Sequence, residues 1–171
     1  MHDASLNKML QKIRYTQAPA ATLLIRLMVG GVFLSEGIQK FLYPASLGSG
    51  RFERIGIPSP ELMGPFVGGV EIIGGILILL GLLTRLAVIP LIFAMCVAMI
   101  TIKLPILLGY GFGGFALRDL ERYGFFSMMH ESRNDLCMII GSLFLLIVGA
   151  GRLSIDAAAA SRDTPRRPQG D

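Results

Sequence analysis

Four charged residues stand inside apolar stretches of this chain, at positions that could support acid–base chemistry. Glu36 and Lys40 are four residues apart, one helical turn, and Glu71 and Lys103 occur in two later apolar stretches. A charge within a bilayer costs a few kcal/mol, so such residues persist where they pair or line a polar cavity. Carboxylates in such a cavity can accept or relay protons. We therefore take Glu71 and Glu36 as candidate catalytic residues, with Lys40 and Lys103 holding their charge.

Helical spacing places these side chains on defined faces. At about 100° per residue, Arg26, Glu36 and Lys40 share one face of the first apolar stretch. Glu71 falls in a stripe of small residues, which lets two helix backbones approach, so Glu71 should face another helix and not lipid. The stripe consists of Gly64, Gly68 and Gly75. Arg26 is a further charge partner, which we expect to reach either lipid headgroups or Glu71.

The rise of about 1.5 Å per helical residue estimates the depth of each charge. Glu36 and Glu71 fall in the same outer half of the membrane, and Lys40 and Lys103 lie at that level or just above it. Charges from three helices therefore converge, which predicts a polar pocket in the outer half. The alternative is a network of interhelical salt bridges that only locks the helices together, with the two lysines reaching the membrane surface.

Four apolar stretches must position these charges, at residues 20–43, 63–83, 85–108 and 135–153. Each approaches the roughly 20 apolar residues that cross a bilayer as a helix. Of the 171 residues 53% are hydrophobic and only 16% charged, and the mean hydropathy is +0.62. We predict an all-α integral-membrane four-helix bundle, a single domain over 1–171. The short connection between the second and third stretches makes them antiparallel neighbours, with Thr84 near a helix start.

The distribution of basic residues sets the expected orientation. More Lys and Arg residues fall in the inner segments than in the outer loops if both termini are cytoplasmic. We therefore expect a multi-pass protein of the bacterial inner membrane, in contact with membrane lipid. The same distribution explains the net charge of +4 without a nucleic-acid partner.

The remaining segments connect or flank the spans. Residues 4–15 have the spacing of a short interfacial helix, with a frayed tail as the alternative, and residues 157–171 are expected to be disordered. Residues 109–134 form a long outer loop rich in glycine and aromatic residues, typical of a lid at the membrane interface. His130 and Glu131 could contact the pocket from this loop.

No metal site is predicted. One histidine with loop carboxylates is far from a defined ligand set, and we expect Ser132 or Asn134 to cap the last span while Asp135 favours its N-terminus. Cys96 and Cys137 lack the Cys-x-x-Cys spacing of a dithiol or zinc ribbon, so we expect them to be packing residues.

Three motifs make the chain resemble the DoxX family of small four-helix bacterial and archaeal membrane proteins. They are Arg26-Leu-x-x-Gly-Gly-x-Phe-x-x-x-Gly-x-x-Lys40-Phe, Gly68-Gly-Val-Glu71-x-x-Gly-Gly-x-Leu-x-Leu-x-Gly-Leu-x-Thr-Arg85, and Gly149-Ala-Gly-Arg-Leu-Ser-Ile-Asp156. The resemblance implies a redox association, since DoxX-like proteins are linked to a thiosulfate:quinone oxidoreductase subunit and to membrane oxidoreductase assemblies. Members often carry a histidine after the outer end of the third span, where this chain offers only Lys103 or the more distant His130.

We therefore interpret the chain as an accessory subunit of a quinone-linked redox complex, with protein partners in the membrane. A quinone headgroup or a lipid would occupy the pocket, and no covalent cofactor is expected. The sequence contains no redox centre of its own, so electrons would come from a partner or a bound organic molecule. The alternative is a structural or assembly subunit of a membrane complex, without chemistry of its own.

Overall fold

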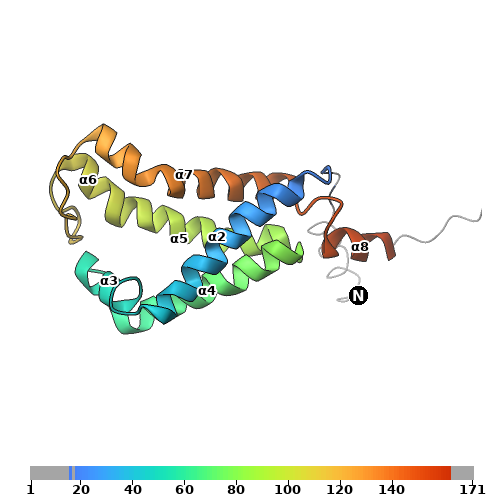
Figure 1. Cartoon of the computed structure of the whole chain (residues 1–171), viewed down its shortest axis with the longest axis horizontal. Coiled ribbons are helices and arrows are strands. Elements are labelled where there is room, and N and C mark those ends of the chain that lie inside the picture. The colour runs from blue at the N-terminus through green and yellow to red at the C-terminus, as the bar shows by residue number, and fades with distance from the viewer. Residues whose placement is uncertain (1–15, 17, 163–171) are drawn as a thin grey trace, which may run out of the picture.

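The computed structural model describes residue 16 and residues 18–162, and within this part of the chain the regular structure is helical, with a single isolated bridge between Phe112 and Phe115. Four long elements form the body. They are α2 (Thr22–Leu42), α4 (Pro60–Leu80), α5 (Thr84–Ala98) with its continuation, and α7 (Phe125–Val148). The continuation of α5 is a π-helical segment, η1 (Met99–Lys103), followed by α6 (Leu104–Leu108). Two short helices, α3 (Ser49–Ile55) and α8 (Ile155–Arg162), lie at opposite ends of the body (Figure 1).

Three helices are long and apolar enough to cross a membrane: Thr22–Leu42, Pro60–Leu80 and Thr84–Leu108. They agree with the predicted stretches 20–43, 63–83 and 85–108 to within a few residues. Pro60 stands in the first turn of α4, where its missing N–H costs nothing, and Gly81 ends the helix with a positive φ of 66°. The predicted stretch 135–153 lies mostly in α7, but α7 is not among these three helices, and its first half carries Glu131, Arg133 and Asp135.

Glycines bring α2 and α4 into close contact along their length (Figure 1). A Cβ atom on Gly37 would lie 2.7 Å from the Gly68 carbonyl oxygen, and one on Gly30 would lie 2.9 Å from that of Gly75. No larger residue fits at these positions without moving a helix, so the predicted close approach at Gly68 and Gly75 is confirmed. Gly64 instead packs against the backbone of Ser49 at the start of α3.

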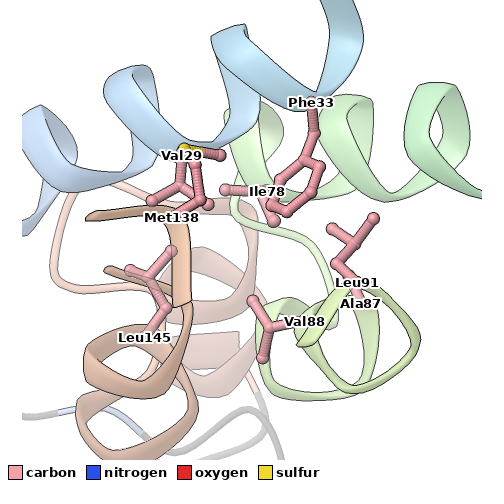
Figure 2. Close-up of a cluster of buried hydrophobic side chains, with 8 residues drawn as sticks. All are labelled: Val29, Phe33, Ile78, Ala87, Val88, Leu91, Met138 and Leu145. Atoms are coloured by element: carbon pink, nitrogen blue, oxygen red, sulfur yellow. The ribbon is translucent and has the colours of Figure 1, made fainter. Parts of the chain in front are cut away.

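The hydrophobic core lies where all four long elements meet, as Figure 2 shows. Phe33 of α2, Ile78 of α4 and Leu91 of α5 are among its largest buried side chains. The remaining members are Val29, Ala87, Val88, Met138 and Leu145. Many other large apolar side chains point outward and are exposed, as expected for helices whose outer faces contact acyl chains.

Two predicted segments differ from the structure. The predicted loop 109–134 is shorter, because α7 already begins at Phe125 and the connection is only 109–124. Ser132 and Asn134 therefore lie inside α7 and cap nothing, and Asp135 is not at a helix N-terminus. The mostly apolar residues 125–129 form the first turns of α7. The aromatic residues among them favoured the interpretation as a loop at the membrane interface.

The predicted disordered tail 157–171 is wrong for residues 157–162, which belong to α8. Four consecutive alanines, the strongest helix formers, follow Asp156 in this helix. Residues 163–171, and the interfacial helix expected over 4–15, lie outside the described residues.

Candidate functional site

A cavity of about 600 Å³ lies toward the α3 end of the bundle, between the α2–α4 pair and the α5–α7 pair. The two pairs diverge toward this end (Figure 1). Glu36, Lys40, Glu71 and Lys103 all line the cavity. The structure therefore brings together the four charged residues that the sequence predicted to converge.

The close approach of α2 and α4 positions the first ion pair. Lys40 Nζ of α2 donates to Glu71 Oε2 of α4 at 2.6 Å, and the two side chains are 11% and 3% exposed. Gly68 lies one turn before Glu71, and a Cβ atom there would be 3.3 Å from Cβ of Lys40. The absence of a side chain at Gly68 thus leaves room for Lys40 to reach Glu71.

A second ion pair joins the π-helical segment η1 to α7. Lys103 Nζ lies 3.0 Å from Asp135 Oδ2 and also donates to the backbone carbonyl of Glu131 at 2.6 Å. The Lys103 side chain is 8% exposed, so its partners replace most of its water. Asp135 is a cavity residue that the sequence interpretation assigned to a helix N-terminus instead.

Two further charged residues line the cavity without such partners. Glu36 on α2 and Arg51 on α3 are half-buried, and neither side chain forms a hydrogen bond or an ion pair with any residue that the structure describes. Polar groups held inside proteins are nearly always satisfied by the protein, by water or by a ligand. Glu36 is therefore an acceptor available to a bound molecule.

Most of the remaining wall is apolar. Phe52 and Ile55 of α3 contribute at one end, and the Ala116 N–H donates to the Ile55 carbonyl at 2.9 Å, which ties loop 109–124 to α3 across the end of the bundle. Phe66 of α4 and Phe93 of α5 also line the cavity, yet they are 61% and 70% exposed. These two exposed rings mark a sideways opening between α4 and α5.

The arrangement suits a largely apolar ligand with one polar end. Binding cavities of this size typically combine apolar walls with a few convergent polar groups. Here the polar groups are Lys40 paired with Glu71, Lys103 paired with Asp135, and the unpaired Glu36. Such a site can bind one ligand through both kinds of group: a lysine ammonium donates hydrogen bonds to the ligand, and a carboxylate accepts one from it.

Arg26 is not part of this cavity, so its prediction as a partner of the pocket is wrong. Its guanidinium donates to four backbone carbonyls near the α8 end of the bundle, those of Ile78, Leu79, Ala150 and Leu153. Two of these acceptors end α4, where helix carbonyls lack partners and the dipole favours a cation. Arg26 is 2% exposed and reaches neither Glu71 nor the surface.

Two other charged residues at this end, Asp156 and Arg85, also make long-range hydrogen bonds. The carboxylate of Asp156 accepts hydrogen bonds from the backbone N–H groups of Leu83 and Thr84, which caps α5 from a segment far along the chain. The Arg85 guanidinium donates to the carbonyls of Leu146 and Ile147, near the end of α7.

The candidates expected in the outer loop separate in the structure. His130 is in α7, exposed and hydrogen-bonded to Arg133, and it does not line the cavity. Glu131 does line it, through the backbone contact to Lys103, while its carboxylate pairs with Arg118 of the loop at 2.8 Å. No group of three potential metal ligands gathers among the residues the structure describes.

Cys96 and Cys137 are both exposed, so the expectation that they pack inside the bundle is wrong. The sequence did not indicate Arg51 as a cavity residue, because the prolines that flank α3 predicted a loop there. A signal was present, since Phe52 and Ile55 have the three-residue spacing of an apolar helix face.

Apolar helices around a charged, laterally open cavity define a helical membrane protein with a candidate ligand site. The DoxX family model matches residues 21–104. The chain is 47% identical over 153 residues to the uncharacterized membrane protein Rv3486 of Mycobacterium tuberculosis, covering 90% of both chains. It is 36% identical over 136 residues to a Bacillus subtilis protein named "Putative oxidoreductase CatD", covering 79% of this chain and 84% of that one. No solved structure matches. The chain belongs to the DoxX family.

Proposed function

We propose that this protein is an accessory subunit of a quinone-linked redox complex in the bacterial inner membrane, and that its cavity receives a quinone headgroup. The observation that carries the proposal is Glu36, a carboxylate without a hydrogen bond or ion pair in the described part of the chain, facing the same cavity as the Lys40–Glu71 pair. The similarity to a protein named as an oxidoreductase supports the redox association.

The proposed topology places four spans in the membrane. The apolar second half of α7 would form the fourth span, beside the three helices that are long and apolar enough to cross a membrane. Both termini would be cytoplasmic. The cavity and α3 would then lie in the outer half of the membrane, and α8 would lie at the cytoplasmic surface. A quinone would enter from the bilayer through the opening beside Phe66 and Phe93.

Each polar group has a defined role in this proposal. A quinone carbonyl would accept a hydrogen bond from Lys40 or Lys103, and Glu36 and Glu71 would be the groups that transfer protons. Reduction to the quinol consumes two electrons, from a partner protein, and two protons, passed through Glu36 and Glu71. Glu71 would hold Lys40 in place before the ligand binds, because the two atoms are already 2.6 Å apart.

This proposal is tested by calorimetry, which measures the binding of a short-tailed benzoquinone to the purified protein. We expect Glu36→Gln and Glu71→Gln to weaken binding at least tenfold and to slow quinone-coupled oxidation in host membranes. Glu61→Gln is the matched control, since Glu61 is an exposed carboxylate in the first turn of α4. Equal binding by folded Glu36→Gln and Glu61→Gln proteins would contradict the proposal.

A structural or assembly subunit is the second candidate. It is favoured by the two ion pairs, since Lys40–Glu71 joins α2 to α4 and Lys103–Asp135 joins η1 to α7. If these charges only specify packing, Glu71→Gln should fail to assemble, and mild-detergent purification should yield a stoichiometric protein partner without quinone. Mass spectrometry of the co-purifying lipids, quinones and proteins distinguishes the two candidates.

A further inference from the structure

A second hollow of about 570 Å³ lies at the α3 end of the bundle and adjoins the cavity already described. Its charged lining consists of Arg51 and Arg54 of α3 with Arg118 and Asp119 of loop 109–124. Three guanidinium groups against one carboxylate make it a basic hollow, which we call the vestibule. Aliphatic side chains of Leu47, Ile55, Ile102 and Leu117 supply most of its remaining wall.

Two of the three arginines are held in place by the protein. Arg54 donates to the backbone carbonyls of Ala45 and Ser46, and Arg118 pairs with Glu131. Arg51 differs from both, since its side chain makes no hydrogen bond or ion pair within the described part of the chain. Its planar fork of donors suits an oxyanion such as a phosphate, which it can bind in bidentate fashion.

The vestibule and the inner cavity are continuous along one wall. Leu47, Arg51, Ile55 and Ile102 line both hollows. A molecule whose anionic group lies among the arginines therefore has an apolar path past Ile55 and Ile102 into the cavity. Phe66 and Phe93 of that cavity are exposed on the outside of the bundle, where the proposed topology would place acyl chains.

We propose that the vestibule binds the phosphate of a membrane phospholipid, with one acyl chain passing Ile102 into the inner cavity. The charge of the arginines, the aliphatic wall and the sideways opening all match this class of amphiphile. The inference goes beyond the proposed function and stands without a quinone. A lipid chain in the inner cavity would compete with a quinone for the same space.

Retention of phospholipid by the purified protein tests this inference. Native mass spectrometry in mild detergent would measure retention of an added phosphatidylglycerol by the wild type, by Arg51→Gln and by Arg152→Gln. Arg152 is the matched control, because it is an exposed arginine beyond α7, away from the α3 end. We expect Arg51→Gln to reduce retention at least fivefold and Arg152→Gln to leave it unchanged.

A second variant distinguishes a lipid from a free phosphate. Ile102→Phe keeps every arginine but narrows the path between the two hollows, so it should reduce lipid retention without affecting binding of soluble glycerol phosphate. Equal lipid retention by Arg51→Gln and Arg152→Gln would overturn the inference. So would full retention by Ile102→Phe together with displacement of the lipid by glycerol phosphate, which would assign the vestibule to a free phosphate. Thermal unfolding of each variant confirms that it is folded. The retention assay contains no added quinone, so failure of the proposed quinone binding would not change its result.

Discussion

The two ends of this bundle treat buried charge differently. At the α8 end, Arg26 and Arg85 donate to backbone carbonyls and Asp156 accepts from backbone N–H groups. At the α3 end, Lys40 and Lys103 pair with the carboxylates of Glu71 and Asp135, whereas the side chains of Glu36 and Arg51 have no hydrogen bond or ion pair in the described part of the chain.

The difference separates structural charges from those that remain available. A guanidinium that satisfies the carbonyls ending a helix completes the fold and has few donors left for a ligand. A carboxylate that faces a cavity contributes little to the fold and keeps its capacity to bind.

Arg26→Met should be the most damaging substitution. It would leave the carbonyls of Ile78 and Ala150 without their donor and would remove a cation that interacts electrostatically with buried Asp156. We expect the free energy of unfolding to fall by about 3–5 kcal/mol, as when one member of a buried charged group is removed. Denaturant unfolding in detergent measures this change. Arg152→Met, at the exposed arginine beyond α7, should change stability by less than about 0.5 kcal/mol. A loss of similar size in both variants would remove the distinction between the two ends.

Gly37→Ala should have an intermediate effect, because the added Cβ would lie 2.7 Å from the Gly68 carbonyl oxygen and would force α2 away from α4. We expect a loss of about 1–3 kcal/mol from overpacking. Gly69→Ala is the control on α4, since a Cβ atom there meets nothing within 4 Å and alanine is the better helix former. Separation of these helices should also lengthen the Lys40–Glu71 contact, so quinone binding should weaken in Gly37→Ala alone. Unchanged stability of Gly37→Ala would show that the α2–α4 contact tolerates expansion.

Glu36→Gln should change stability least. Glu36 has no hydrogen bond or ion pair to lose within the described residues, so we expect less than about 0.5 kcal/mol. The same substitution should remove most of the quinone binding proposed above. A loss of stability as large as that of Arg26→Met would place Glu36 among the structural charges.

The apolar pattern and helical spacing predicted much of this arrangement. Three spans have nearly the predicted bounds, Gly68 and Gly75 contact α2, and Lys40, Glu71 and Lys103 line one cavity. The spans and helix faces follow from spacing within each helix, and the rise per residue places charges of different helices at one depth. The predictions of a fourth span, of both cytoplasmic termini and of the role of the cavity remain predictions.

The contacts that the sequence could not predict are those between distant segments. Thr84 was expected near a helix start and is the first residue of α5, but nothing in its neighbourhood indicates that Asp156 supplies the cap. Arg26 shares a helix face with Glu36, yet its partners are backbone carbonyls, which carry no residue-specific signal. The beginning of α7 was placed too late for a similar reason, since the polar residues at 130–135 resemble a loop until their partners are known.

The π-helical segment Met99–Lys103 makes chain length, as well as residue type, a determinant of the cavity. Such a segment accommodates one residue more than an α-helix would over the same turn, and it is often found at functional sites. Removing one residue between Met99 and Ile102 would let this turn close as an ordinary α-helix, so the π-helical turn would be lost while every charge stays in the chain. The turn that brings Lys103 to Asp135 of α7 would then change shape without substitution of a charged residue, so relatives that lack one residue here are expected to have a differently shaped cavity.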